Sequence, residues 1–309
     1  MRGAIFIPAI AQTEWVREVL PGTSPAELPV AGRRFIDYLL EAAQRRGLDM
    51  AEVTDWHPSP RLADEFSSLT RTVIPVFYRD GAGDLPRGLD DIPAMQGPLS
   101  SRLEEGIVAV WGLVLPLHPP GETTLEPITP AERANTPPGI YRHTGDGWMR
   151  VSPHGFPARD VKSWFDLNMT VAETPCGFTL PGYSSEDGVH LGSNVVLERG
   201  TEASPPVILG DNSWCGRFVT LGGNVVVGGG AVISEGTTLR RTVVCDNTFV
   251  GPYLDLTDKI VVGNRIIDGR TGTWTDLEEE SLAHDVHRAP RWLHAIANFL
   301  AGTSRGRRC

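Results

Sequence analysis

The sequence predicts an α/β domain, then an all-β coil of short parallel strands, then a short helical cap. Three observations lead to this prediction. The chain has 309 residues, enough for two domains with separate cores. Predicted strands and helices alternate in the first part, which is typical of a layered fold with a largely parallel sheet. A six-residue repeat follows. The expected boundaries are 1–185 for the α/β domain, 186–268 for the coil and 269–309 for the helical segment.

The repeat runs in one register from Leu191 to Val250, slips by one residue and continues to Ile267. All ten first positions of the hexads are apolar, and nine of the ten fifth positions are Ser, Thr, Ala or Val. An even period suits strands, whose side chains alternate between two faces, and does not suit an α-helix. We therefore expect flat strands joined at corners. The first positions should point inward, among them Leu191, Leu209, Leu221, Val227 and Ile233.

Composition excludes several classes of function. The net charge is -10, which argues against a nucleic-acid surface. No apolar stretch is long enough for a membrane-spanning helix, and the apolar run Gly3–Ala11, broken by Pro8, is interpreted as a buried strand. The cysteines show neither zinc-type spacing nor a disulfide pattern, so a reducing, cytoplasmic compartment is expected. Cys215 and Cys245 fall on inward positions of the repeat and are expected to be core residues.

The elements outside the repeat follow from apolar periodicity and from capping residues. The predicted strands are Ala4–Ile10, Ala51–Trp56, Val73–Tyr78 and Gly106–Leu115, and the predicted helices are Arg33–Arg46 and Pro60–Leu69. Residues 116–138 are interpreted as a long surface loop. After the repeat, Thr275 and Glu278 fit a helix capping box, and a second helix can start at Pro290. These helices are expected to cover the open end of the coil.

The repeat resembles that of the hexapeptide-repeat proteins, which implies a left-handed parallel β-helix with three hexads in each turn. The α/β domain and the coil together resemble the NDP-sugar pyrophosphorylases, which are sugar-1-phosphate nucleotidyltransferases. The stretches that carry this resemblance are Leu28–Leu40, Gly139–Gly147, Trp164–Met169 and Tyr183–Val196. The resemblance implies nucleotide or sugar binding by Gly32, Arg33, Gly139, Tyr141 and Asn168. It also implies a magnesium ligand at Asp166.

The chain departs from this family where the family binds triphosphate. The family has a Gly-rich loop after its first strand, then a Lys, and an Asp at the end of a central strand. Here Gly22 is the only glycine in the stretch Ala9–Glu27, and Ala26–Glu27 stands where the Lys is expected. The central strand ends in Trp111–Gly112–Leu113, without a carboxylate. The sequence thus lacks the backbone cradle, the cation and one of the metal-binding carboxylates that nucleotidyl transfer uses.

The resulting prediction is a nucleotidyltransferase-like protein of sugar-nucleotide or polysaccharide metabolism with a degenerate active site and a binding, regulatory or scaffold role. No catalytic residue is assigned. One alternative is an active sugar-1-phosphate nucleotidyltransferase with a rewired site and Mg²⁺ as cofactor. Another is a hexapeptide-repeat acyltransferase, for which His190 is the candidate base near the coil. The expected partners are a sugar phosphate or nucleotide-sugar, a second copy in a homo-oligomer, and an active paralogue.

Each candidate residue also has a plainer interpretation. Asp166 is either a remnant metal ligand or an ordinary turn or cap residue. Arg33 and Arg34 either contact phosphate or begin a solvated helix. Gly81–Asp84 is either a nucleotide-binding loop or a plain turn. The histidines after the coil have helical spacing but no evident acidic or cysteine partner for a metal: His284, His287 and His294.

Overall fold

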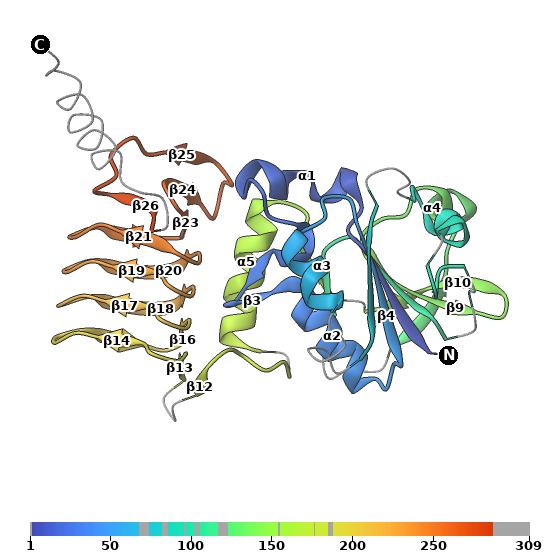
Figure 1. The fold of residues 1–309 in the computed structure, drawn as a ribbon, viewed down its shortest axis with the longest axis horizontal. Helices are drawn as coiled ribbons and strands as arrows, with labels where there is room; N and C mark the ends of the chain where they lie inside the picture. The colour runs from blue at the N-terminus through green and yellow to red at the C-terminus, as the bar shows by residue number, and fades with distance from the viewer. Residues whose placement is uncertain are drawn as a thin grey trace, which may run out of the picture. The chain divides into compact units, whose positions relative to one another are not determined.

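The structure is a computed structural model, and it divides the chain into two compact units, Met1–Leu180 and Pro181–Cys309 (Figure 1). It describes residues 2–286, apart from 68–73, 82–85, 96, 102, 104–105, 117–122, 154, 176 and 185–187. No helix in these described ranges is long and apolar enough to cross a membrane.

The first unit is built on a seven-stranded sheet in the order β5-β4-β1-β6-β9-β10-β8. Its parallel half consists of β1 (Gly3–Ile7), β4 (Met50–Asp55), β5 (Val76–Asp80) and β6 (Val108–Trp111). Its antiparallel half consists of β9 (Gly139–Thr144), β10 (Gly147–Ser152) and β8 (Thr124–Pro127). The predicted α/β class is therefore confirmed. The parallel strands belong to the part of the chain in which strands and helices were predicted to alternate.

The remaining elements of this unit are short. The helices are α1 (Ile10–Val19), α2 (Phe35–Arg45), α3 (Pro60–Ser67), α4 (Pro130–Ala134) and α5 (Val161–Glu173), with 3-10 turns η1 (Pro25–Glu27) and η2 (Leu89–Ala94). Two strand pairs stand apart from the main sheet: β2 (Pro29–Val30) with β3 (Arg33–Arg34), and β7 (Val114–Pro116) with β11 (Gly155–Pro157).

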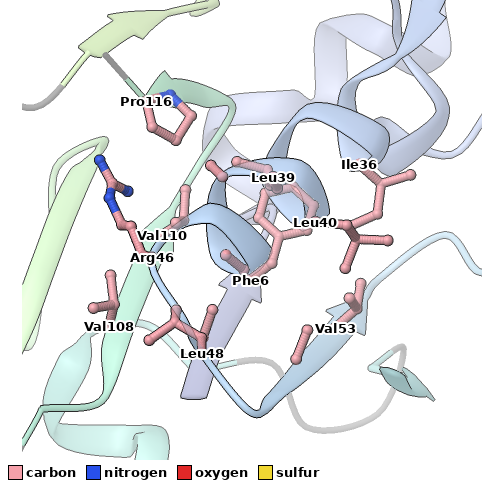
Figure 2. A pocket seen from close by; sticks show the side chains of 14 residues that line it. Phe6, Ile36, Leu39, Leu40, Arg46, Leu48, Val53, Val108, Val110 and Pro116 are labelled. Atoms are coloured by element: carbon pink, nitrogen blue, oxygen red, sulfur yellow. The ribbon is translucent and has the colours of Figure 1, made fainter. Parts of the chain in front are cut away.

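Alternation along the strands gives the sheet two apolar faces. On one face, Phe6 and Val110 meet Leu39 of α2 around a cavity of about 30 Å³ (Figure 2). On the other face, Ile5 and Trp111 belong to a buried cluster that also contains residues of β9 and η2. This double burial explains the near-continuous apolar runs of the parallel strands.

Some sequence-based boundaries were wrong. The first strand ends at Ile7, and α1 begins at Ile10. The expected strand Gly106–Leu115 is split into β6 and β7, because Gly112 has a φ of +75°, which ends the extended chain. The supposed loop 116–138 contains β8 and α4, and Thr129 caps α4 by accepting a hydrogen bond from the Glu132 N–H.

The second unit is a stack of short parallel strands, in which many paired residues lie 18 positions apart. One row contains β13 (Val189–Leu191), β16 (Val207–Leu209), β18 (Thr220–Val227), β20 (Thr238–Val244) and β23 (Lys259–Val262), with β15 (Glu202–Ser204) paired to β18 and β22 (Asp255–Thr257) to β20. A second row contains β14 (Val196–Leu197), β17 (Trp214–Cys215), β19 (Val232–Ile233) and β21 (Thr248–Val250), and both rows are visible in Figure 1. β12 (Tyr183–Ser184) pairs antiparallel with β13. The predicted parallel, strand-rich region is therefore confirmed.

Residues with positive φ mark the corners between these strands. Most recur at intervals of six, or of five where the register slips, with one interval of twelve between Gly200 and Asn212; they are Asn194, Gly200, Asn212, Phe218, Asn224, Gly230, Gly236, Arg241, Asn247, Tyr253 and Asp258. A left-handed residue at these corners lets the chain change direction between flat segments. The even spacing explains why the hexad pattern is readable in the sequence.

The inward assignment holds for most of the stack. Leu209, Leu221, Val227 and Ile233 are fully buried in one cluster with Cys215, and burial raises the pKa of the Cys215 thiol to about 12. Cys245 is also buried, as expected. The first hexads differ: Leu191 is half-buried, and both Leu197 and Ala203 are exposed. They lie in the first rung, which has a parallel neighbour on one side only.

The helix expected from Thr275 is not formed. β24 (Arg265–Asp268) and β25 (Trp274–Asp276) continue the sheet antiparallel to β23, and β26 (Ala283–Asp285) pairs antiparallel with β21. The carboxylate of Asp276 binds the Arg265 guanidinium across this hairpin instead of capping a helix. Antiparallel strands thus protect edges of the stack that the sequence assigned to helices. The second helix, predicted from Pro290, lies outside the described residues.

Replacing Leu221 with Asp tests the packing of the stack. The substitution places an unpaired carboxylate at a fully buried site, so we expect a loss of about 3–5 kcal/mol in the free energy of unfolding. Leu197→Asp is the matched control, because Leu197 also holds a first hexad position but is 42% exposed; its cost should stay below about 1 kcal/mol. Denaturant unfolding measures both, and equal stability losses would contradict the inward assignment of Leu221.

Candidate functional site

The stretch that carries the family resemblance folds into a small hairpin bound to α5. Ala31 and Gly32, with φ of +44° and +77°, form its two-residue turn between β2 and β3. The Ala31 N–H donates to Oδ1 of Asn168 at 2.8 Å, and the Trp164 indole donates to the carbonyl of Pro29 at 2.7 Å. The structure therefore brings Gly32 and Asn168 together. Asn168 is 1% exposed, and its side-chain amide binds the hairpin backbone at Ala31 and Pro29.

Arg33 is occupied by contacts within the protein. Its Nη1 donates to Oε2 of Glu41 and to the carbonyl of Thr179, each at 2.5 Å, and its guanidinium lies 4.6 Å from the centre of the Tyr38 ring. Burial alone would raise the pKa of Glu41, but hydrogen bonds from Arg33 and Thr179 outweigh it and lower that pKa. A phosphate would have to displace this carboxylate to bind Arg33.

Arg34 is held even more completely. Its two Nη atoms lie 2.7 and 2.8 Å from the carboxylate of Glu65, and Nε and Nη2 also donate to Asp37. The Glu65 hydrogen bond raises the pKa of Arg34 further above its usual range, so the charge is permanent but is neutralised locally. Both arginines of the hairpin therefore face protein carboxylates.

Asp166 does not form a metal site in the described part of the chain. Its side chain is exposed on α5, and no group of three or more His, Cys, Asp or Glu residues among the described ones is placed to hold a metal ion. A single exposed carboxylate does not provide the oxygen ligands that Mg²⁺ needs beside a phosphate. His284 contacts the carbonyl of Glu280 and stacks on Phe249. His287 and His294, and residues 82–84 of the supposed nucleotide loop, lie outside the described residues.

Gly139 and Tyr141 both lie on β9 and support the core. Tyr141 is fully buried, and its hydroxyl donates to the carbonyl of Pro137 at 2.8 Å. A Cβ at position 139 would lie 3.1 Å from the Tyr141 hydroxyl oxygen, so a larger residue would require the Tyr141 ring to shift by a few tenths of an ångström. Burial raises the pKa of Tyr141 and keeps the phenol neutral. The six residues implied by the resemblance are thus spread over the hairpin, α5 and β9.

A separate polar cluster lies where β4 ends, at the carboxyl edge of the parallel strands. Its centre is Asp55, which is fully buried and accepts hydrogen bonds from the Ser24 hydroxyl, from the Tyr78 hydroxyl at 3.1 Å and from the His57 N–H at 3.0 Å. Burial raises the pKa of Asp55 despite these donors. Burial and the charge of Asp55 together raise the pKa of Tyr78. We call Ser24, Asp55, His57 and Tyr78 the polar edge.

Helix α1 joins the polar edge to the point where the strand order reverses. The Trp56 indole donates to the hydroxyl of Thr13, which in turn donates to the carbonyl of Ala9 at the start of α1. Gln12 donates to the carbonyl of Thr136, and its Oε1 lies 2.6 Å from where a Cβ at Gly112 would be. In open α/β sheets, ligands bind outside the carboxyl ends of the strands at such a reversal, here between β1 and β6.

The polar edge contains hydroxyl, imidazole and carboxylate groups rather than clustered cations, and Ser24 and Asp55 are fully buried. The charges of Asp55 and the nearby Glu27 both act to raise the pKa of Tyr78, so the local potential is negative and opposes a triphosphate. Sequence reasoning predicted the strand that ends at Trp56 but overlooked Asp55. A carboxylate at the end of a buried parallel strand was the signal that pointed to it.

The raised pKa of Asp55 predicts a pH-dependent stability. A folded pKa above the unfolded value of about 3.9 gives stabilisation that is complete below that value and is lost as pH rises through the folded pKa. Asp55→Asn has similar size and does not titrate. We expect the free energy of unfolding of the parent, relative to that of Asp55→Asn, to decrease as pH rises above about 4. Urea unfolding at a series of pH values measures it, and an increase with pH would contradict the assignment.

No family model matches the chain, and no curated protein matches its sequence.

Proposed function

We propose that this is a nucleotidyltransferase-like protein of sugar-nucleotide or polysaccharide metabolism that binds a sugar-phosphate or nucleotide-sugar and is a poor pyrophosphorylase. The observation that carries the proposal is the pairing of Arg33 with Glu41 and of Arg34 with Glu65. The stretch that resembles the family's nucleotide-binding segment contains both arginines, but each of them forms an ion pair with a carboxylate of the protein.

Electrostatics supports a binding role over turnover. Nucleotidyl transfer depends on groups that neutralise developing oxyanion charge, and loss of one such group typically costs about 10²–10³ in rate. Here the expected Lys is replaced by Glu27, α1 begins three residues after β1 in place of a Gly-rich loop, and Gly112 follows β6 without an Asp. No Mg²⁺-dependent step is assigned, because no group of three or more His, Cys, Asp or Glu residues in the described ranges is placed to hold the ion.

The sugar hydroxyls are assigned to the polar edge. A pyranose or ribose presents vicinal hydroxyls that donate to a carboxylate such as Asp55 and accept from groups such as Tyr78. Because Asp55 is fully buried, a ligand would reach it only by displacing a present partner such as the Ser24 or Tyr78 hydroxyl, so moderate affinity is expected. His190 remains the candidate base for the acyltransferase alternative; it is half-buried on β13, and burial lowers its pKa.

For the second unit we infer a left-handed parallel β-helix. The 18-residue register, the parallel rows and the positive-φ corners support a three-sided coil with three hexads in each turn. Flat sides of such coils pack together in related folds, so we expect a homo-oligomer, a dimer or trimer. Light scattering over a concentration series measures the mass, and a monomer at high concentration would contradict this expectation.

A thermal-shift panel tests the proposed ligand class. Nucleoside triphosphates, nucleotide-sugars, hexose 1-phosphates and acyl-CoA are each added with and without Mg²⁺. A ligand at ten times its Kd stabilises the folded state by about 1.4 kcal/mol, which raises the midpoint by a few degrees. We expect nucleotide-sugars or hexose phosphates to act without Mg²⁺. Asp55→Asn should lose this shift, whereas Asp49→Asn, at the opposite end of β4, should retain it.

Pyrophosphate release measures turnover directly. Each nucleoside triphosphate is combined with a set of hexose 1-phosphates and Mg²⁺, and we expect rates far below about 1 s⁻¹, the lower end of ordinary enzyme turnover. A rate at or above that value, lost in Asp166→Asn, would overturn the degenerate-site proposal in favour of the rewired enzyme. A shift by acyl-CoA alone would favour the acyltransferase.

A further inference from the structure

One corner of the strand stack carries aromatic side chains in alternation with glycine. Successive rungs place Gly200, Phe218, Gly236 and Tyr253 at this corner, with φ of +83°, +57°, +67° and +56°. Backbone hydrogen bonds hold the rungs in line, since Phe218 N–H donates to the carbonyl of Arg199 and Gly236 N–H to that of Arg217. We call Phe218 and Tyr253 the aromatic corner.

Both rings are unusually exposed for aromatic side chains. Phe218 is 66% exposed and Tyr253 is 73% exposed. Each ring lies over the glycine of the preceding rung: a Cβ at Gly200 would come within 2.5 Å of Phe218, and a Cβ at Gly236 within 2.5 Å of Tyr253. One face of each ring therefore covers the backbone of the preceding rung, and the other face is open to solvent.

This arrangement is costly to maintain without a ligand. A bulky aromatic residue with positive φ is strained, and the same corner accepts glycine on alternate rungs. The ring faces that are exposed to solvent do not contribute to stability through burial in the core. Such local strain is characteristic of positions kept for binding.

The spacing and the surroundings of the rings indicate what binds. The two rings are two rungs apart, about 9.6 Å at ordinary strand spacing, which is roughly the length of two pyranose rings in an extended chain. Exposed Arg217 and Glu235 flank the rings, and the Tyr253 hydroxyl donates to Oε1 of Glu235 at 3.0 Å. A sugar ring presents a C–H face that stacks on an aromatic ring and a rim of hydroxyls that reaches charged neighbours.

We propose that the aromatic corner binds an extended glycan chain of diequatorially linked pyranoses, with alternate sugars stacked on Phe218 and Tyr253. A protein partner fits the corner less well, because protein interfaces are built around a contiguous, largely uncharged core. Here two separate rings on a ridge alternate with glycine and are flanked by charges. This inference concerns the second unit and does not rest on the ligand proposed for the polar edge.

Affinity electrophoresis in gels that contain a soluble β-1,4-glucan derivative tests the proposal. We expect the parent protein to be retarded, and an α-1,4-glucan, whose chain is helical, to have little effect. Phe218→Gly and Tyr253→Gly place at each site the residue that the corner already uses, so both should fold with an unchanged or higher Tm. Each should bind about tenfold more weakly, the size of one aromatic stacking contact.

Trp274→Ala is the matched control, because Trp274 is an exposed aromatic on β25, outside the aromatic corner. It should leave the retardation unchanged. Equal mobility of the parent in gels with and without β-1,4-glucan would overturn the proposal. So would self-association of the parent that Phe218→Gly abolishes without any glycan binding, since the corner would then be a contact between copies.

Discussion

The hydrogen bond from Ala31 to the buried Asn168 side chain fixes the hairpin on which the first unit's charge arrangement depends. A buried amide that lost this partner would leave a polar group unsatisfied at a cost of about 1–3 kcal/mol. With the turn held at Ala31 and Gly32, Arg33 reaches Glu41 and Arg34 reaches Glu65. Together with the Trp164–Pro29 hydrogen bond, this contact between distant parts of the chain positions the hairpin and its two cations.

In this unit, the residues that stabilise the hairpin are therefore different from the residues proposed to bind a ligand. The side chains of the hairpin and α5 satisfy one another, and the polar edge around Asp55 lies at the ends of the strands. A phosphate-binding site concentrates unpaired donors, whereas here the donors of Arg33 and Arg34 already meet carboxylates. At the polar edge, the favourable ligand groups are therefore hydroxyls, which are the part of a sugar phosphate or nucleotide-sugar that we assign to it.

The sequence predicted elements whose pattern is local and periodic. The hexads revealed the strand stack because corners and core positions recur at a fixed interval, and the apolar alternation revealed the parallel strands. It failed at Thr275, where a capping-box pattern competes with an antiparallel pairing to β24 that only the folded chain supplies. It also missed Asp55, whose partners Ser24 and Tyr78 are far apart in the sequence. The residues of the motif can be recognised in the sequence, but their spacing does not predict that Arg33 forms an ion pair with Glu41.

The register of the stack limits how the second unit can change in length. Partners lie 18 residues apart in the first rungs and 17 apart in later ones, with the shift between Gly222 and Val225. A one-residue insertion or deletion within a strand would turn the side chains that follow it to the other face, unless a bulge absorbs the change, as happens between Gly222 and Val225. Whole rungs can be gained or lost during evolution without such an adjustment, and a duplicated rung would carry with it another copy of each corner.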